Sequence, residues 1–212
     1  MIKAIIFDMW TTVIYSDWNF GNKVINALDL TIEKEEELWL LLEKDWMMHR
    51  FDTFEDSAKH ACIALGIKDS KKIKKFAELY EESRKHIKPY DDVLPVIKKL
   101  RKKYKIGLLS NTENFTIPVL DKIGFLDNFD AAFFSCDHKK LKPDKRFFRA
   151  ILKVLGAKPE ETVMVGDSMK SDIIPAKQLG MNAILMDRHN KHPKVKDRIK
   201  SLDNIEKIIA KL

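Results

Sequence analysis

The sequence is poor in cysteine and has no long apolar run. Its 212 residues include only two cysteines, Cys62 and Cys136, too few for a disulfide framework. No stretch reaches the roughly 18 uninterrupted apolar residues that a membrane-spanning helix needs. The opening MIKAIIFDMW lacks the basic and apolar regions of a secretory signal. We therefore expect a cytoplasmic protein with no membrane partner.

Internal repeats and low-complexity tracts are also missing. Hydrophobic residues make up 45% of the chain, enough for a real core, and charged residues make up 33%, enough for a solvated surface. The formal net charge is +7, but the lysines are spread along helix faces, as in Lys71, Lys72, Lys74 and Lys75. Such blocks are usually solvated surface, so we expect no nucleic-acid partner.

Short apolar runs recur along the chain, each followed by a polar residue. They are Lys3–Phe7, Ile106–Leu109, Ala131–Phe134, Thr162–Val165 and Ala183–Met186. Runs of this length suit strands that are buried on both faces, as in a parallel sheet. Helical patterns separate them, for example Phe148, Ile151, Leu152 and Leu155 before Gly156. This alternation predicts an α/β protein with a doubly wound parallel sheet.

One segment breaks the alternation. From Tyr15 to Lys88 we find helical patterns only, and Pro89 marks the return to strand–helix alternation. We therefore expect two units: a core formed by residues 1–14 and 89–212, and an inserted all-helical domain formed by residues 15–88.

Three polar residues fall directly after predicted strands: Asp8, Ser110 and Asp167. In open parallel sheets, ligands bind outside the carboxyl ends of the strands, so these side chains should converge on one crevice. A single Asp in such a place is often only a helix cap. Three converging polar ends, together with Lys142 farther along the chain, favour a functional site.

The segments FDMWTTV, LLSNT, LKPD and VGDSMKSD, in this order, resemble the four motifs of the haloacid dehalogenase superfamily. The resemblance covers the whole chain, including the position of the helical insertion. It implies a hydrolase with a Rossmann-like core, a helical cap domain over the site, and Asp8 as the nucleophile.

The resemblance also implies a role for each carboxylate. Asp8 would be a carboxylate nucleophile that attacks phosphorus to form an aspartyl-phosphate. Mg²⁺ would orient the phosphate and offset the repulsion between anions. Its ligands would be Asp8, the backbone carbonyl of Trp10, Asp167 and Asp172. Asp172 equally suits the N-cap of a helix, and both roles are compatible.

The remaining predicted site residues would bind the substrate. Ser110 and Asn111 would donate hydrogen bonds to phosphate oxygens. Lys142 would stabilise the charge that develops during transfer, and it counts with Asp8 and Ser110 as catalytic. Thr12 stands where the family has a hydroxyl residue. We expect the substrate to be a small phosphorylated metabolite, and the sequence leaves monomer and homodimer open.

Trp10 departs from the family pattern. Superfamily phosphatases usually have a second Asp at this position, which protonates the leaving group and later activates water. An indole offers only an N–H donor. Two alternatives therefore stay open: a 2-haloacid dehalogenase-like enzyme in which Asp8 attacks carbon, and a catalytically impaired binding or interaction protein. Asp167 and Asp172 favour the metal-dependent phosphatase, because halide displacement needs no metal.

Residues of the helical insertion are weaker candidates. The candidate substrate contacts are Asp17, Trp18, Trp46, Met47 and Arg50. We expect the aromatic and Met members to form the core of the cap, and Arg50 to be surface. The six histidines show no metal-ligand spacing.

Overall fold

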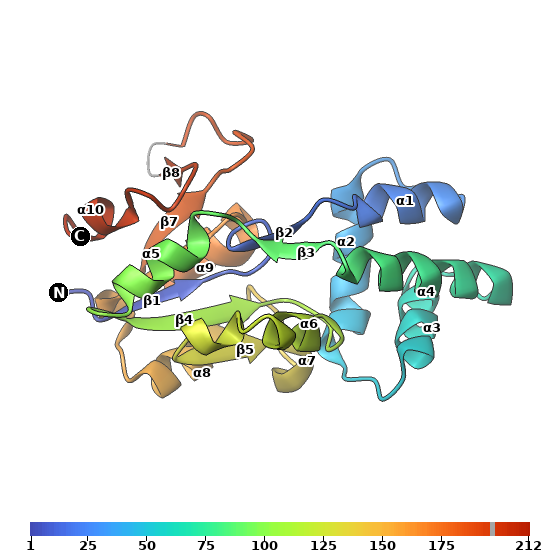
Figure 1. The fold of residues 1–212 in the computed structure, drawn as a ribbon, viewed down its shortest axis with the longest axis horizontal. Helices are drawn as coiled ribbons and strands as arrows, with labels where there is room; N and C mark the ends of the chain where they lie inside the picture. Colours follow the sequence, from blue (N-terminus) through green and yellow to red (C-terminus); the bar gives the residue numbers. More distant parts are fainter. Residues whose placement is uncertain (196–197) are drawn as a thin grey trace.

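The structure is a computed structural model that describes residues 1–195 and 198–212. It contains a sheet with helices packed around it and a separate group of helices to one side (Figure 1). None of the helices in this described part of the chain has the length and apolar character needed to cross a bilayer.

A six-stranded sheet forms the centre of the larger unit. Its strands are β1 (Ala4–Phe7), β4 (Lys105–Ser110), β5 (Ala131–Phe134), β6 (Thr162–Gly166), β7 (Asn182–Met186) and β8 (Arg198–Ile199). They lie in the order β5-β4-β1-β6-β7-β8, and every neighbouring pair is parallel. The predicted α/β parallel sheet is confirmed, and all five apolar runs are strands. β8 was not predicted, because two residues are too few to show a pattern.

Helices cover both faces of this sheet. They are α5 (Val93–Leu100), α6 (Thr116–Lys122), α7 (Ser135–His138), α8 (Lys145–Leu155), α9 (Ile174–Gln178) and α10 (Ile205–Ile209), with the short turns η2 (Leu126–Asn128), η3 (Pro159–Glu161) and η4 (Met169–Ile173). Side chains alternate along a strand. Accordingly, Ile5 and Phe7 of β1 join the apolar cluster that contains α5 and α10, while Ile6 joins the cluster of α8 and α9.

One glycine sets the distance between β4 and α8. A Cβ atom at Gly107 would lie 3.0 Å from side-chain atoms of Ile151 and Leu155. The missing side chain therefore allows α8 to pack closely against the sheet. At the end of this helix, Gly156 adopts a left-handed φ of 65°, as its predicted role as a stop signal requires.

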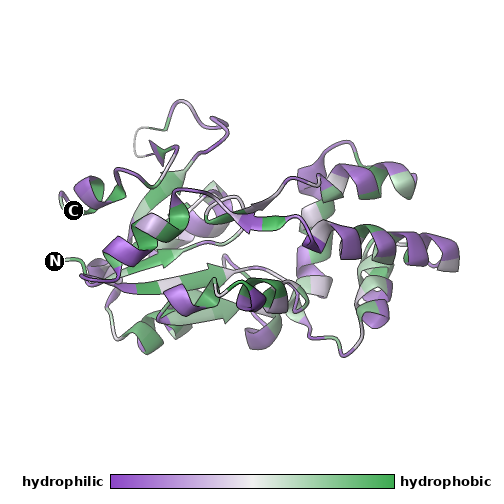
Figure 2. Cartoon of the chain, viewed as in Figure 1, coloured by the Kyte–Doolittle hydropathy of each residue, from purple (hydrophilic) through white to green (hydrophobic). Residues whose placement is uncertain are grey.

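The helical insertion consists of α1 (Phe20–Ala27), α2 (Glu35–Asp45), the single turn η1 (Trp46–Met48), α3 (Phe54–Ala64) and α4 (Ser70–Arg84). These elements enclose an apolar cluster of their own, in which Leu38, Trp46 and Phe76 are fully buried. In Figure 2 the strands of the large sheet are mainly hydrophobic in colour, whereas α4 is largely hydrophilic, with its few apolar residues on the covered side.

Two short strands connect the units. β2 (Ile14–Ser16) pairs antiparallel with β3 (Ile87–Pro89), so both crossings between core and cap run along one ribbon (Figure 1). The expectation of helical patterns alone from Tyr15 to Lys88 is therefore wrong at its two ends. Strands of three residues show no periodicity that could be recognised in the sequence. The domain limits at residues 15 and 88 stay a prediction.

Candidate active site

The carboxylate of Asp8 lies at the carboxyl end of β1 and is buried. The Thr12 hydroxyl donates a hydrogen bond of 3.0 Å to Asp8 Oδ2. The Lys142 ammonium donates to Asp8 Oδ1. Both carboxylate oxygens are thus engaged, which fixes the orientation of the predicted nucleophile.

Asp167 and Asp172 approach Asp8 from the end of β6. Oxygen atoms of the three carboxylates all lie within 4.8 Å of one another. Asp172 comes so close to β6 because Gly166 has no side chain: a Cβ atom there would lie 2.6 Å from the Cβ of Asp172. The structure therefore brings together three carboxylates that are up to 164 positions apart in the sequence.

Asp172 is not the N-cap of the helical segment after β6, because Ser168 has that role. Ser168 precedes η4, and its hydroxyl accepts a hydrogen bond of 3.0 Å from Ser171 N. The Asp172 carboxylate accepts a bond of 3.0 Å from Ser168 N. This reciprocal pairing at the start of η4 holds Asp172 in place and leaves its Oδ1 directed at Lys142, 2.7 Å away.

Lys142 is buried between the carboxylates. Its backbone is held by Asn111, whose side-chain amide donates to Lys142 O at 3.1 Å and accepts from Lys142 N at 2.8 Å. The predicted phosphate ligand Asn111 therefore also positions the lysine. Burial alone would lower the pKa of Lys142, but the charges of Asp172 and Asp8 outweigh it, and the net effect raises the pKa.

The three carboxylates carry more negative charge than Lys142 can offset. Burial, followed by the charges of Asp8 and Asp172, raises the pKa of Asp167 to about 8. Burial and the charge of Asp8 raise the pKa of Asp172 to about 6, although Lys142 opposes the rise. A divalent cation among these oxygens would supply the missing positive charge, and hard oxygen ligands are what Mg²⁺ prefers. The donor set fits Mg²⁺.

Ser110 and Trp10 border this group. Ser110 ends β4, is fully buried, and donates a bond of 3.3 Å to the Asn111 carbonyl. The Trp10 indole packs against the apolar core and donates a bond of 3.4 Å to Thr112 Oγ1. Among the residues that the structure describes, no backbone N–H donates to the Trp10 carbonyl. Its predicted role as a metal ligand stays a prediction.

The turn after the nucleophile is strained. Thr11, which replaces a frequent Gly of the family, has a left-handed φ of 61°. Such a conformation is uncommon for a β-branched residue. Arg188, which sequence reasoning missed, helps to hold the turn: its guanidinium donates to Thr12 O at 2.9 Å and pairs with Asp92 at 3.0 Å. It follows β7, where a basic residue gave no motif to recognise.

The five candidate substrate contacts of the cap are engaged elsewhere. Asp17 pairs with His86 and Lys88, and Trp18 stacks on His86. Trp46 and Met47 are buried in the cap, as expected, and Arg50 pairs with Asp137. Two histidines contradict the expectation from spacing: His49 and His60 lie together with Asp45.

One cap carboxyl that the sequence did not indicate is influenced by the charges of the site. Glu43 of α2 is half-buried. Burial raises the pKa of Glu43, the Asn111 amide and the Lys142 charge lower it, and the charge of Asp8 raises it. Charges of the site, those of Lys142 and Asp8, thus act on the Glu43 carboxyl in opposite directions. Nothing in the helical pattern of α2 distinguishes Glu43 from its exposed acidic neighbours.

Known proteins share this architecture. The haloacid dehalogenase-like hydrolase family matches residues 2–180. Glyceraldehyde 3-phosphate phosphatase of Methanocaldococcus jannaschii is 32% identical over 195 residues, 85% of this chain and 83% of the relative. A 2-haloacid dehalogenase from Pseudomonas syringae has a similar structure, with a TM-score of 0.68 and 23% identity over 100% of this chain and 99% of that one. A family enzyme of Bacteroides thetaiotaomicron in complex with magnesium and inorganic phosphate has a TM-score of 0.63 and 20% identity over 88% and 94% of the two chains.

The chain belongs to the haloacid dehalogenase-like hydrolase family. The resemblance predicted from its motifs is confirmed, and the protein is a hydrolase with relatives that are phosphatases. A dehalogenase and an enzyme that binds magnesium and phosphate share its fold. The fold therefore does not distinguish attack at carbon from attack at phosphorus. Only the residues of the site can distinguish these two reactions.

Proposed function

We propose that this hydrolase is a Mg²⁺-dependent phosphatase that acts on phosphate monoesters of small metabolites. The observation that carries the proposal is the group of Asp8, Asp167 and Asp172, whose oxygens lie within 4.8 Å of one another beside the Lys142 ammonium. Halide displacement at carbon has no need of so many converging carboxylates. The phosphatase relatives support the same choice, and glyceraldehyde 3-phosphate is a suitable first substrate.

In the proposed reaction, an Asp8 oxygen attacks phosphorus, the bond from phosphorus to the ester oxygen breaks, and the phosphoryl group is carried on Asp8. Water then attacks this aspartyl-phosphate and releases inorganic phosphate. Mg²⁺, held by Asp8, Asp167, Asp172 and the Trp10 carbonyl, would supply charge neutralisation and orientation of the phosphate. Lys142 and Ser110 would stabilise the phosphoryl oxygens during transfer.

The leaving oxygen needs a proton that Trp10 cannot supply. General acid–base catalysis is typically worth about 10²–10⁴-fold in rate. Glu43 of the cap is our candidate donor, because burial raises the pKa of its carboxyl and the charges of Lys142 and Asp8 act on it. Without any donor, alkyl and sugar phosphates would react poorly, while aryl phosphates with good leaving groups would still react.

The test is a panel of phosphate esters, including glyceraldehyde 3-phosphate and an aryl phosphate, assayed with Mg²⁺ and with a chelator. We expect turnover that requires Mg²⁺ and that Asp8→Asn abolishes. Absence of turnover even of the aryl phosphate would overturn the proposal. Thr12→Ser, which keeps the hydroxyl that orients Asp8, serves as a matched control and should remain active.

Trp10 is the reason to test a second candidate function, dehalogenation at carbon. An aromatic residue two positions after the nucleophile is what haloacid dehalogenases have, so 2-chloropropionate belongs on the substrate panel. Chloride release that a chelator does not affect would favour attack at carbon. Ligand binding without turnover of any substrate would instead favour the impaired binding protein, and Trp10→Asp then asks whether the rest of the site is competent.

A further inference from the structure

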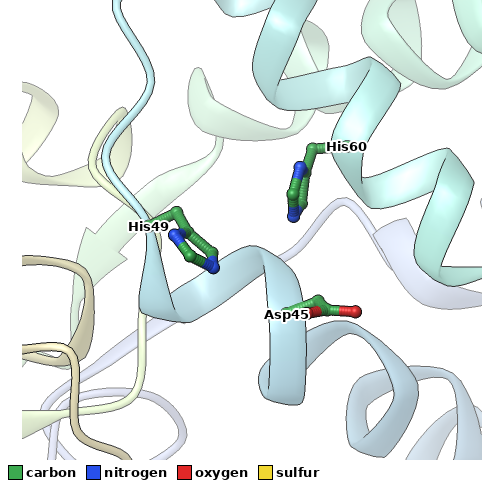
Figure 3. A group of neighbouring side chains, drawn as sticks. All are labelled: Asp45, His49 and His60. Atoms are coloured by element: carbon green, nitrogen blue, oxygen red, sulfur yellow. The ribbon is translucent and has the colours of Figure 1, made fainter.

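The cap has a second group of side chains that could hold a metal ion, and it shares no residue with the carboxylates around Asp8. Asp45 is the last residue of α2, His49 follows η1, and His60 lies on α3. One ligand atom from each of the three lies within 4.8 Å of the other two. Figure 3 shows both imidazole rings directed into the space between α2 and α3, with the Asp45 side chain at its edge.

From this arrangement we propose that Asp45, His49 and His60 bind a divalent transition-metal ion of the Zn²⁺ type. Two imidazoles and a carboxylate are a donor set that suits Zn²⁺, whereas the all-oxygen group at Asp8 suits Mg²⁺. Asp45 and His49 are exposed and His60 is partly exposed, so a water molecule is free to complete a tetrahedral set.

The geometry is close to what a bound ion requires. Zn–N bonds of about 2.0–2.1 Å place tetrahedral ligand atoms about 3.4 Å apart. The ligand atoms must therefore close by at most about 1.4 Å, which rotation of the exposed Asp45 and His49 side chains provides. Asp45 and His49 are four positions apart in the sequence. The chain then reverses between η1 and α3, which brings His60 close to both.

None of the three side chains is committed to another partner. Within residues 1–195 and 198–212, no hydrogen bond or ion pair involves the side chain of Asp45, His49 or His60. The imidazoles lie beside aromatic rings: their own centroids are 5.3 Å apart, and the Phe51 ring lies 5.0 Å from that of His60. Their nitrogen atoms are therefore available to a cation.

The backbone that presents these ligands is held in place. Trp46 Nε1 donates a buried bond of 2.8 Å to Ser57 Oγ, which ties η1 to α3 one turn before His60. The amide of Asn114 pairs with both backbone groups of Phe51, at 2.9 and 3.1 Å. These anchors restrict the movement of the segment that carries His49. Much of the entropic cost of assembling the site is thereby met in the folded protein.

The site also lies on the part of the cap that contacts the core. Ser135 Oγ donates a bond of 2.6 Å to Met47 O, and Asn114 follows the strand end that carries Ser110. A metal that joins α2 to α3 here would stabilise the edge of the cap that holds Glu43, two residues before Asp45. It is thus placed to stabilise the cap without taking part in the chemistry at Asp8.

The direct test is a Zn²⁺ titration of the full chain with saturating Mg²⁺, followed by the NMR signals of the six histidine rings. We expect the His49 and His60 signals to shift. His49→Ala and His60→Ala should each weaken Zn²⁺ binding, measured by calorimetry, by more than about tenfold, because even second-shell changes at metal sites cost 10–100-fold. Zn²⁺ at about 100 times its Kd should raise the Tm of the wild type by about 5 °C or more.

His86→Asn is the matched control. His86 lies 2.9 Å from Asp17 and 3.6 Å from Glu82, so it has two carboxylates but no second imidazole, and its replacement should leave Zn²⁺ binding unchanged. If His49→Ala were poorly folded, Asp45→Asn at the exposed helix end provides a second variant. Zn²⁺ binding that persists in the His49 and His60 variants, or that disappears only in Asp167→Asn, would overturn the proposal.

Discussion

Removal of the divalent cation should make the protein lose stability as the pH rises from about 6 to about 8. In the folded chain without metal, burial and neighbouring charges raise the pKa of Asp167 to about 8. In the unfolded chain an Asp has a pKa of about 3.9. Across this pH range the folded protein therefore holds a proton on Asp167 that the unfolded chain has already released, so raising the pH favours unfolding.

The size of the effect follows from proton linkage. One proton difference changes the free energy of unfolding by about 1.4 kcal/mol per pH unit. Two pH units therefore remove about 3 kcal/mol, which for a chain of this size lowers the Tm by about 6–12 °C. Asp172 acts in the same direction at lower pH, because its pKa is raised to about 6. Its contribution is therefore lost mainly below the range considered for Asp167.

Mg²⁺ should remove this penalty. A metal binds ionised carboxylates and displaces their protons, so its stabilising effect should be larger at pH 8 than at pH 6. The assay is urea or thermal unfolding at both pH values, with chelator and with Mg²⁺. Asp167→Asn is the control, because it cannot titrate and should flatten the profile. Equal stability at pH 6 and pH 8 in chelator, with no gain from Mg²⁺, would refute the assignment of the metal site.

Three further predictions concern single residues. Gly166→Ala should lower kcat/KM by about 10²-fold, because the added methyl group displaces the Asp172 carboxylate by about 1 Å; unchanged turnover of an aryl phosphate would contradict this. Glu43→Gln should slow alkyl phosphates by about 10²-fold or more and aryl phosphates little, measured as the ratio of the two rates. Trp46→Phe should reduce the free energy of unfolding by about 1 kcal/mol, because it removes the buried bond to Ser57, and denaturant unfolding measures it.

The core could be predicted from the sequence because its signals are local and repeated. Each buried strand is a short apolar run that ends at a polar residue, and the carboxyl ends of parallel strands meet at one edge. Asp8, Ser110 and Asp167 were placed together by this rule alone. Asp172 and Lys142 needed the family resemblance as well, because neither directly follows a strand.

What the sequence did not indicate depends on how the cap packs on the core. Glu43 is one of several acidic residues on α2, and nothing in their spacing distinguishes it from the others. His49 and His60 are eleven positions apart, a spacing that gains meaning only when η1 packs against α3. β2 and β3 were missed for a simpler reason, because three residues carry too little pattern. Expectations for location and assembly state stay predictions.

The proton for the leaving group would come from a different part of this protein than in other phosphatases of the family. In those enzymes the proton donor sits on the core, two residues after the nucleophile. Here that position carries an indole that donates to Thr112, and our candidate donor, Glu43, comes from α2 of the cap. Proton delivery would then depend on the position of the cap, whereas attack by Asp8 would not. Changes that loosen the cap should therefore slow esters with poor leaving groups and spare those with good ones.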